Sequence, residues 1–129
     1  MVTTMMSRTM TRRGFTLIEM LVVLSVIGLL LSIAAPSYLG HIDRARDLAL
    51  KQDLKTVRDS IDKFQADRGR GPTDLSELVT AHYLRELPVD PVTDSASTWV
   101  PVQVDGVGVH DLHSGAPGNG ADGTPYASW

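Results

Sequence analysis

After a short basic stretch, the chain carries a run of mainly apolar residues at positions 15–35, in which Glu19 is the only charged residue. A helix rises about 1.5 Å per residue, so this run reaches about 30 Å, the thickness of the hydrocarbon core of a bilayer. Arginines precede the run, and the next one along the chain is Arg44. This asymmetry predicts one membrane-spanning helix with a cytoplasmic N-terminus and the body of the chain across the membrane.

Beyond Pro36 the pattern becomes that of an amphipathic helix over residues 37–68. A proline inside a helix removes a backbone hydrogen bond, so we expect a kink at Pro36. Apolar residues then recur at helical spacing along one stripe, which predicts packing on a core. The stripe consists of Ile42, Leu50, Leu54, Val57, Ile61 and Phe64. Acid-before-base pairs four residues apart, which are typical of a solvated helix face, are Asp47 with Lys51 and Asp59 with Lys63.

A small head over residues 72–129 follows, because the glycines and the proline of residues 69–72 end the long helix. Thr73 or Asp74 can cap a short second helix. Glu77 stands three residues after Asp74, which is the spacing of a capping box. The head is therefore expected to begin with a short helix.

Two β-rich runs, residues 99–104 and 107–112, flank an Asp-Gly pair and predict an antiparallel hairpin. The glycine-rich tail then ends on Tyr126 and Trp129. It is either a loose terminus or a segment whose aromatic residues dock back on the body. Together these elements predict an α+β fold: a long N-terminal helix packed on a short helix and a small antiparallel sheet, with a Gly/Asp-rich C-terminal loop.

The composition and charge of the chain argue against several classes of function. The formal net charge is −3, although three arginines and no acid lie in the first fourteen residues, so the body is acidic. An acidic body lacks the basic surface that nucleic-acid binding requires. The absence of cysteine excludes disulfides and thiolate metal sites. His110 and His113 lie three apart on a strand, so their rings point to opposite faces and shared zinc is not expected. No catalytic motif appears, and no enzymatic activity is expected.

The N-terminal segment has several interpretations on these grounds. A plain membrane anchor does not require Glu19, and an acid within a span is costly and marks a functional site by default. A twin-arginine export signal is suggested by Arg12 and Arg13, with small residues up to Ala35 as its cleavage region. Against it, the apolar run is longer than that of the usual signal and contains an acid.

A third interpretation rests on the sequence RRGFTLIE at residues 12–19, followed by the long apolar helix. It closely resembles the class III signal of type IV pilins and type II secretion pseudopilins, and Pro36 matches the family as well. The resemblance implies that a prepilin peptidase cuts after Gly14, that Phe15 becomes the N-methylated first residue, and that Glu19 is kept for assembly. The chain would then comprise a leader (1–14), a transmembrane assembly helix (15–36) and a periplasmic domain (37–129).

The chemistry of the residues is consistent with this resemblance. Gly14 has no side chain, so an extended peptide can approach a protease backbone there. The cut makes a new amine at Phe15, and an amine and a carboxylate attract strongly in low dielectric. We expect Glu19 to select the register of subunits by pairing with the Phe15 amine of another subunit or of its own.

The head resembles the major pseudopilins of type II secretion, in which a C-terminal loop binds calcium. The resemblance implies Asp122 as the leading ligand, with Asp111, Asn119 and the carbonyls of Leu112 and Ser114 as weaker ones. Calcium takes about six to eight oxygen ligands, and this tail has fewer acids than the loop usually carries. A structural Ca²⁺ is the one expected cofactor.

The resemblance implies a filament subunit, the major pseudopilin of a type II secretion system, with one span in the bacterial inner membrane and a periplasmic C-terminal domain. Its partners would be further copies in a helical filament, the prepilin peptidase, the minor pseudopilins, the inner-membrane platform and membrane lipid. Two alternatives stay open: a type IV pilin or minor pilin, and a periplasmic binding domain exported by a twin-arginine signal.

Overall fold

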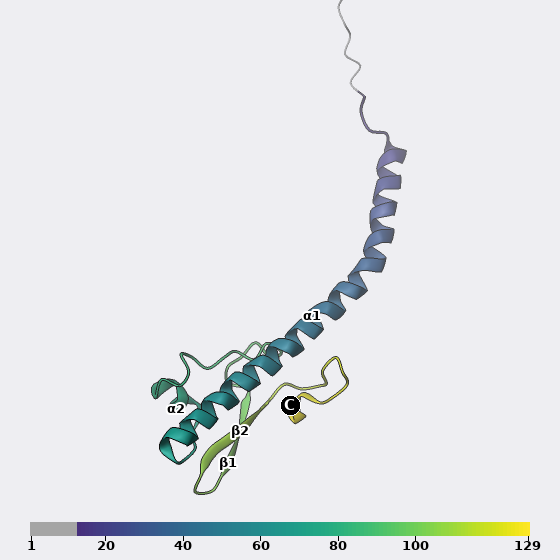
Figure 1. Cartoon of the computed structure of the whole chain (residues 1–129). Coiled ribbons are helices and arrows are strands. Elements are labelled where there is room, and N and C mark those ends of the chain that lie inside the picture. Colours follow the sequence, from purple (N-terminus) through teal and green to yellow (C-terminus); the bar gives the residue numbers. More distant parts are fainter. Residues whose placement is uncertain (1–12) are drawn as a thin grey trace, which may run out of the picture. The chain divides into compact units, whose positions relative to one another are not determined.

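A computed structural model describes residues 13–129, so the predicted leader lies outside the described residues except for Arg13 and Gly14. The elements, in order, are α1 (Leu17–Arg68), α2 (Leu75–Thr80), β1 (Trp99–Val104), β2 (Gly108–Ser114) and the 3-10 helix η1 (Tyr126–Ser128) (Figure 1). The predicted α+β fold is confirmed. The chain divides into a first unit that ends at Ser37 and a second unit, Tyr38–Trp129, and each is described by itself.

The described part of the first unit, residues 13–37, comprises the N-terminal part of α1 and the four residues before it. Every residue from 13 to 37 is exposed. By length and composition this part of α1 can cross a membrane, and none of its apolar window is buried by the described chain. Pro36 lies inside α1, which continues through it; the kink at Pro36 stays a prediction. The apolar side chains of this unit therefore need an environment that the chain itself does not supply.

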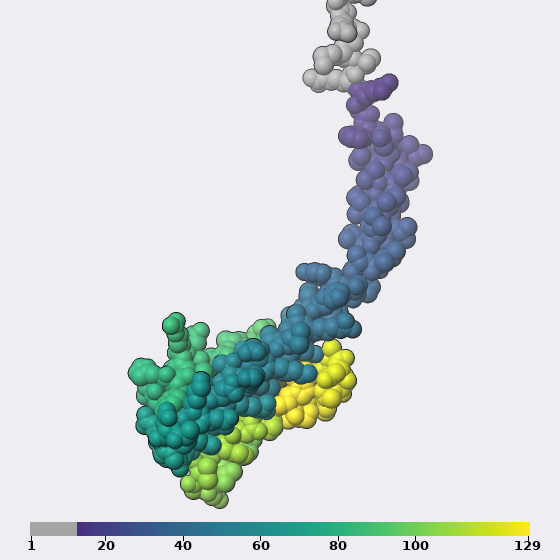
Figure 2. All heavy atoms as spheres, in the orientation of Figure 1, coloured from purple at the N-terminus to yellow at the C-terminus, as the bar shows by residue number. Residues whose placement is uncertain are grey.

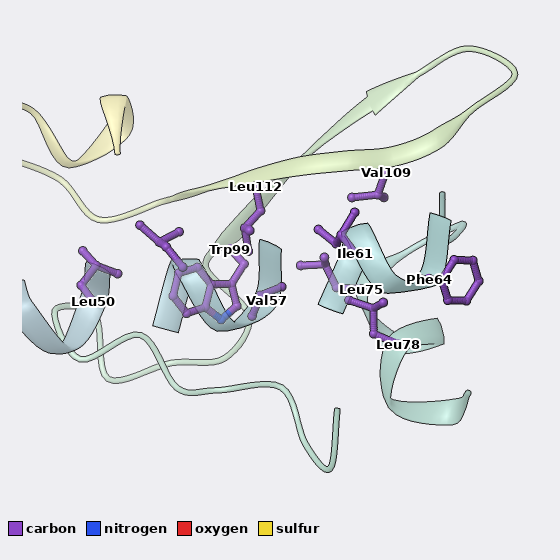
Figure 3. Packing of buried hydrophobic residues seen from close by; sticks show 10 residues of the cluster. Leu50, Val57, Ile61, Phe64, Leu75, Leu78, Trp99, Val109 and Leu112 are labelled. Carbon is purple, nitrogen blue, oxygen red and sulfur yellow. The ribbon is translucent and has the colours of Figure 1, made fainter. Parts of the chain in front are cut away.

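The second unit is built around the C-terminal part of α1. The predicted stripe is confirmed, because five of its six residues are at most 1% exposed: Leu50, Leu54, Val57, Ile61 and Phe64. The sixth, Ile42, is half-buried. Figure 3 shows how side chains from α2 and the hairpin complete this core: Leu75, Leu78, Trp99, Val109 and Leu112. Each such buried side chain contributes about 1.5–3 kcal/mol relative to exposure.

The boundaries of the two helices follow local rules. α1 ends at Arg68, and Gly69 takes the left-handed conformation (φ 69°) that favours glycine after a helix. Of the two predicted caps, Asp74 is the one used, since its carboxylate accepts a hydrogen bond from the Glu77 amide at 3.0 Å. Glu77 in turn pairs with Arg70 at 2.7 Å. The short helix is therefore fixed at its first turn.

The predicted hairpin is present, and β1 and β2 pair antiparallel with one irregularity between Val102 and Gln103. β2 extends to Ser114, beyond the predicted run. Ser114 is buried, and its hydroxyl donates to Asp90 at 2.6 Å. The hydrogen bond to Asp90, which lies outside the sheet, anchors Ser114. This anchor explains why β2 continues past the predicted end at Leu112.

Both predicted ion pairs along α1 are wrong. Asp47 is only 7% exposed and binds the C-terminal segment instead of Lys51. Asp59 is held at 2.8 Å by Lys55, which lies one turn before it, and not by Lys63. The docking of the tail is confirmed, since Tyr126 and Trp129 are partly buried against the core. Figure 2 shows the C-terminal residues, in yellow, lying against α1.

Candidate functional site

The predicted cleavage site lies directly before α1. Arg13 to Thr16 have no regular secondary structure, and Phe15 is 78% exposed. A Cβ atom added to Gly14 would meet nothing within 4 Å. The peptide bond between Gly14 and Phe15 is thus accessible in an irregular segment, which is the form in which a protease binds a substrate.

Glu19 lies in the first turn of α1 and has a partner within its own chain. Its amide donates to the Thr16 hydroxyl at 3.2 Å, and its carboxylate accepts from the Thr16 amide at 3.5 Å. These reciprocal contacts form a capping box, and an acid at a helix N-terminus is further favoured by the helix dipole. Sequence reasoning missed this role, although the spacing Thr-x-x-Glu at residues 16–19 is its signal.

The predicted calcium ligands lie in different local environments. Asp111, on β2, accepts from Arg58 Nε and from the Leu112 amide, both at 2.7 Å. Arg58 also donates through Nη2 to the Leu112 carbonyl at 2.9 Å. Burial by itself would raise the pKa of Asp111, but the hydrogen bonds from Arg58 and the Leu112 amide outweigh it and lower the pKa. Two of the predicted oxygens, those of Asp111 and Leu112, therefore already bind a cation, the Arg58 guanidinium.

Asp122 lies in the C-terminal loop and has its own partners. Its carboxylate accepts from the Thr124 hydroxyl at 2.6 Å and from the Thr124 amide at 2.9 Å. The hydroxyl hydrogen bond is the largest cause of the lowered pKa of Asp122. Lys51 lies 3.7 Å from the other carboxylate oxygen. Asp122 therefore closes its own turn and pairs with a lysine of α1.

The remaining two predicted ligand residues make contacts through other atoms. Asn119 pairs through its backbone with Pro125 in an isolated bridge, and Ser114, whose carbonyl was the predicted ligand, donates its hydroxyl to Asp90. Within residues 13–129, no group of three or more His, Cys, Asp or Glu side chains is arranged to hold a metal ion. The acidic side chains of this part of the chain are thus not gathered in one cluster, and calcium binding stays a prediction.

Asp47 is a buried anchor for the C-terminal segment that sequence reasoning placed on the wrong face. Its Oδ1 accepts from the Tyr126 hydroxyl at 2.7 Å, and its Oδ2 accepts from the Ala121 amide at 2.6 Å. Asp47 precedes Leu50 by three residues and so continues the spacing of the buried stripe. That position was the signal, because an acid on a buried stripe needs partners from another segment.

Three comparisons with known proteins bear on these sites. Residues 9–35 match the family model described as the prokaryotic N-terminal methylation motif. This range contains Gly14, Phe15 and Glu19. The model therefore matches the segment in which the cleavage and assembly residues were predicted. No solved structure matches the chain significantly.

Curated relatives cover most of the chain. The type II secretion system core protein G of Klebsiella pneumoniae is 30% identical over 91% of this chain and 90% of its own length. The protein of the same name from Escherichia coli strain K12 is 30% identical over 82% of each chain. That of Xanthomonas campestris is 28% identical over 83% of this chain and 71% of its own. With the methylation motif and the fold, these likenesses show that the chain belongs to the type II secretion system core protein G family of pseudopilins.

Proposed function

We propose that this chain is the major pseudopilin of a type II secretion system, a structural subunit that polymerises into a filament and acts mechanically. The observation that carries this proposal is the apolar part of α1, whose side chains are exposed throughout the first unit. Lipid can cover such a helix before assembly, and the helices of neighbouring copies can cover it afterwards. The relatives named core protein G support the same function and favour it over a type IV pilin or an exported binding domain.

Before assembly, the chain is proposed to be a single-pass protein of the bacterial inner membrane. The arginines before α1 favour a cytoplasmic N-terminus, which leaves the second unit in the periplasm. The prepilin peptidase is its proposed processing partner. Further copies, the minor pseudopilins and the inner-membrane platform are its proposed assembly partners.

Processing is proposed to break the bond between Gly14 and Phe15 and to methylate the new amine of Phe15. The exposed, irregular segment before α1 supports this position. The product keeps all of α1, which begins at Leu17, so the processed subunit stays in the membrane. It also carries a cationic amine four residues before the Glu19 carboxylate.

Mass spectrometry of the membrane-bound chain tests this processing. Co-production with a prepilin peptidase is expected to give a chain that begins at methylated Phe15, and omission of the peptidase is expected to give an uncut chain. A Gly14→Val variant, which places a branched side chain at the cut, is expected to stay uncut. A mature chain that begins after Ala35 would instead support twin-arginine export and contradict the proposal.

Glu19 is proposed to serve assembly through its charge, in addition to its place in the capping box. The two roles can be separated, because glutamine at the same position keeps the capping hydrogen bond but carries no charge. A subunit that enters the filament in the wrong register would leave the carboxylate without its cationic partner, and an unpaired charge in low dielectric is costly.

The test compares Glu19→Gln with Glu19→Ala by electron microscopy and sedimentation of filaments from cells that produce the secretion system. Both variants are expected to abolish filaments. The exposed acid Glu86 provides the matched control, and Glu86→Gln is expected to assemble as wild type does. If Glu19→Gln assembled normally while Glu19→Ala did not, the carboxylate would be only a helix cap.

A further inference from the structure

The C-terminal segment, residues 116–129, is ordered against α1 although it has little regular structure. Its only helix is η1, and its only strand-like pairing is the bridge from Asn119 to Pro125. In the described residues, no buried side-chain nitrogen or oxygen lacks a hydrogen-bond partner. The segment is therefore held by specific contacts of its side chains and amides rather than by regular structure.

Asp47 is the central anchor. It accepts one hydrogen bond from the backbone of the segment, at Ala121, and one from a side chain, the Tyr126 hydroxyl. Each carboxylate oxygen of Asp47 thus has a donor, and hydrogen bonds to a charged acceptor are about twice as strong as neutral ones. The segment is attached at two points, five residues apart, to one buried side chain of α1.

Lys51 and Trp129 make a second attachment one turn further along α1. The Lys51 ammonium lies 4.4 Å from the centre of the Trp129 ring and 3.7 Å from Asp122. The Trp129 ring also packs edge-on against Tyr126, with 5.0 Å between ring centres. A Cβ atom on Gly120 would collide with the Trp129 ring, so any other residue there would force the ring to shift.

Cationic side chains already contact three of the predicted calcium ligands. Arg58 binds the Asp111 carboxylate and the Leu112 carbonyl, and Lys51 pairs with Asp122. A calcium ion needs about six to eight oxygens at short distance. To collect them here, it would have to displace an arginine and a lysine and join two carboxylates that now have separate partners.

We propose that the C-terminal segment of this chain is held on α1 by a metal-independent clamp, in which Asp47 binds Ala121 and Tyr126 and Lys51 binds Trp129. The cations Arg58 and Lys51 balance the charges of Asp111 and Asp122, the carboxylates predicted to face a metal ion. This inference is independent of the proposed secretion function, because it concerns only how the second unit holds its own segment.

Hydrogen exchange with mass spectrometry, on the full chain in detergent micelles, tests the clamp. Wild-type chain is compared in excess EDTA and in excess Ca²⁺, and exchange is followed in peptides from residues 116–129. The clamp predicts the same protection in both solutions. Slower exchange in Ca²⁺ than in EDTA would overturn the proposal, because the segment would then depend on the metal.

Variants test the anchor itself. Asp47→Asn keeps the shape but loses the charge and one acceptor, and it is expected to speed exchange in this segment by about tenfold or more. The exposed acid Asp62 on the same helix provides the control, and Asp62→Asn is expected to behave as wild type. Unchanged exchange in Asp47→Asn would contradict the clamp.

A milder variant keeps the test valid if Asp47→Asn does not fold. Tyr126→Phe keeps the aromatic ring and removes only the hydroxyl that reaches Asp47. It is expected to speed exchange within residues 116–129 in both EDTA and Ca²⁺, with core peptides of α1 unchanged. Wild-type protection in this variant would remove Tyr126 from the clamp and overturn the proposed geometry.

Discussion

Two buried carboxylates, Asp47 and Asp90, tie irregular segments of the second unit to its core. Asp90 is fully buried and accepts from the Val92 amide at 2.8 Å and from the Ser114 hydroxyl at 2.6 Å. A buried charge is tolerated only when such hydrogen bonds replace its water. Asp90 thus joins the loop before β1 to the last residue of β2.

Replacement of Asp90 is expected to be strongly destabilising. Asp90→Ala would leave the Ser114 hydroxyl and the amides of Val92 and Thr93 without their acceptor, which should lower the free energy of unfolding by about 2–3 kcal/mol. Chemical denaturation of the full chain in detergent, followed by tryptophan fluorescence, measures the change. An exposed aspartate gives the comparison, and Asp62→Ala is expected to change the free energy by less than about 0.5 kcal/mol. Equal stability of the two variants would contradict the role given to Asp90.

The Tyr126 hydroxyl is expected to lose its proton at a higher pH than an ordinary tyrosine does. Its hydrogen bond to Asp47, together with burial and nearby negative charge, raises the pKa of Tyr126 from 10.0 to about 12. Because the folded pKa is the higher one, this bond contributes stability below pH 10.0 and loses its contribution as the pH rises towards about 12. The ultraviolet tyrosinate spectrum of wild type minus that of Tyr126→Phe should show one transition near pH 12. A transition at the ordinary value would mean that Asp47 does not hold the hydroxyl.

At the scale of elements, α2 depends on its first turn because it has only six residues. Isolated helices of that length are not stable in water. Here the Asp74 carboxylate caps the Glu77 amide, and the Glu77 carboxylate binds Arg70 and the Thr73 amide. The pKa of Asp74 is lowered chiefly by the hydrogen bond from the Ser76 hydroxyl. Hydrogen bonds to charged side chains therefore stabilise the first turn of α2, which is too short to be stable by itself.

Acid is expected to open the start of α2. Hydrogen bonds from Arg70 and from the Thr73 amide lower the pKa of Glu77 from 4.5 to about 2. Since the folded pKa is the lower one, the contribution is complete above pH 4.5 and is lost as the pH falls towards about 2. Arg70→Gln should move the Glu77 pKa back towards its ordinary value, as measured by carboxyl NMR titration. The exposed Arg85 offers a control, because Arg85→Gln should leave the titration of Glu77 unchanged.

At the scale of the whole molecule, the two units differ in how they place their apolar side chains: the second unit buries them in a core, and the described part of the first unit exposes them. Among residues 13–129, every residue of the buried core cluster belongs to the second unit, Tyr38–Trp129. The first unit has exposed apolar side chains along its helix. The second unit can therefore fold on its own contacts, whereas the first needs lipid or other copies of the chain.

A fragment of residues 38–129 is expected to be a soluble, folded monomer. Circular dichroism should show a cooperative thermal transition, and size-exclusion chromatography should give a monomer without detergent. The full chain is expected to need detergent under the same conditions, because its apolar helix is uncovered. A fragment that aggregates or lacks a cooperative transition would show that residues before 38 are needed for the core.

Much of this protein could be predicted from local patterns in its sequence. The three-four spacing from Leu50 to Phe64 predicted the buried stripe, because a helix places such residues on one face. The Asp-Gly pair between two β-rich runs predicted the hairpin, and Asp74 with Glu77 predicted the start of α2. These signals are local, so a sequence is sufficient to read them. The motif at residues 12–19 likewise lies in one short stretch.

Other features depended on contacts between residues far apart in the chain. Asp47 meets Ala121 and Tyr126 across 74 and 79 positions, and Arg58 meets Asp111 across 53. An acid on a helix looks the same in the sequence whether it faces water or a distant loop, so the sequence predicted a solvated face for Asp47. The sequence likewise does not show that Arg58 lies beside Asp111, for which a metal ion was the predicted partner. The sequence by itself determined the apolar helix, the N-terminal methylation motif and the core stripe, because each lies in one continuous stretch of the chain. Only the tertiary structure decided which donor each carboxylate binds, because those donors are brought together only when the chain folds: the C-terminal segment supplies those of Asp47, and α1 supplies Arg58 for Asp111.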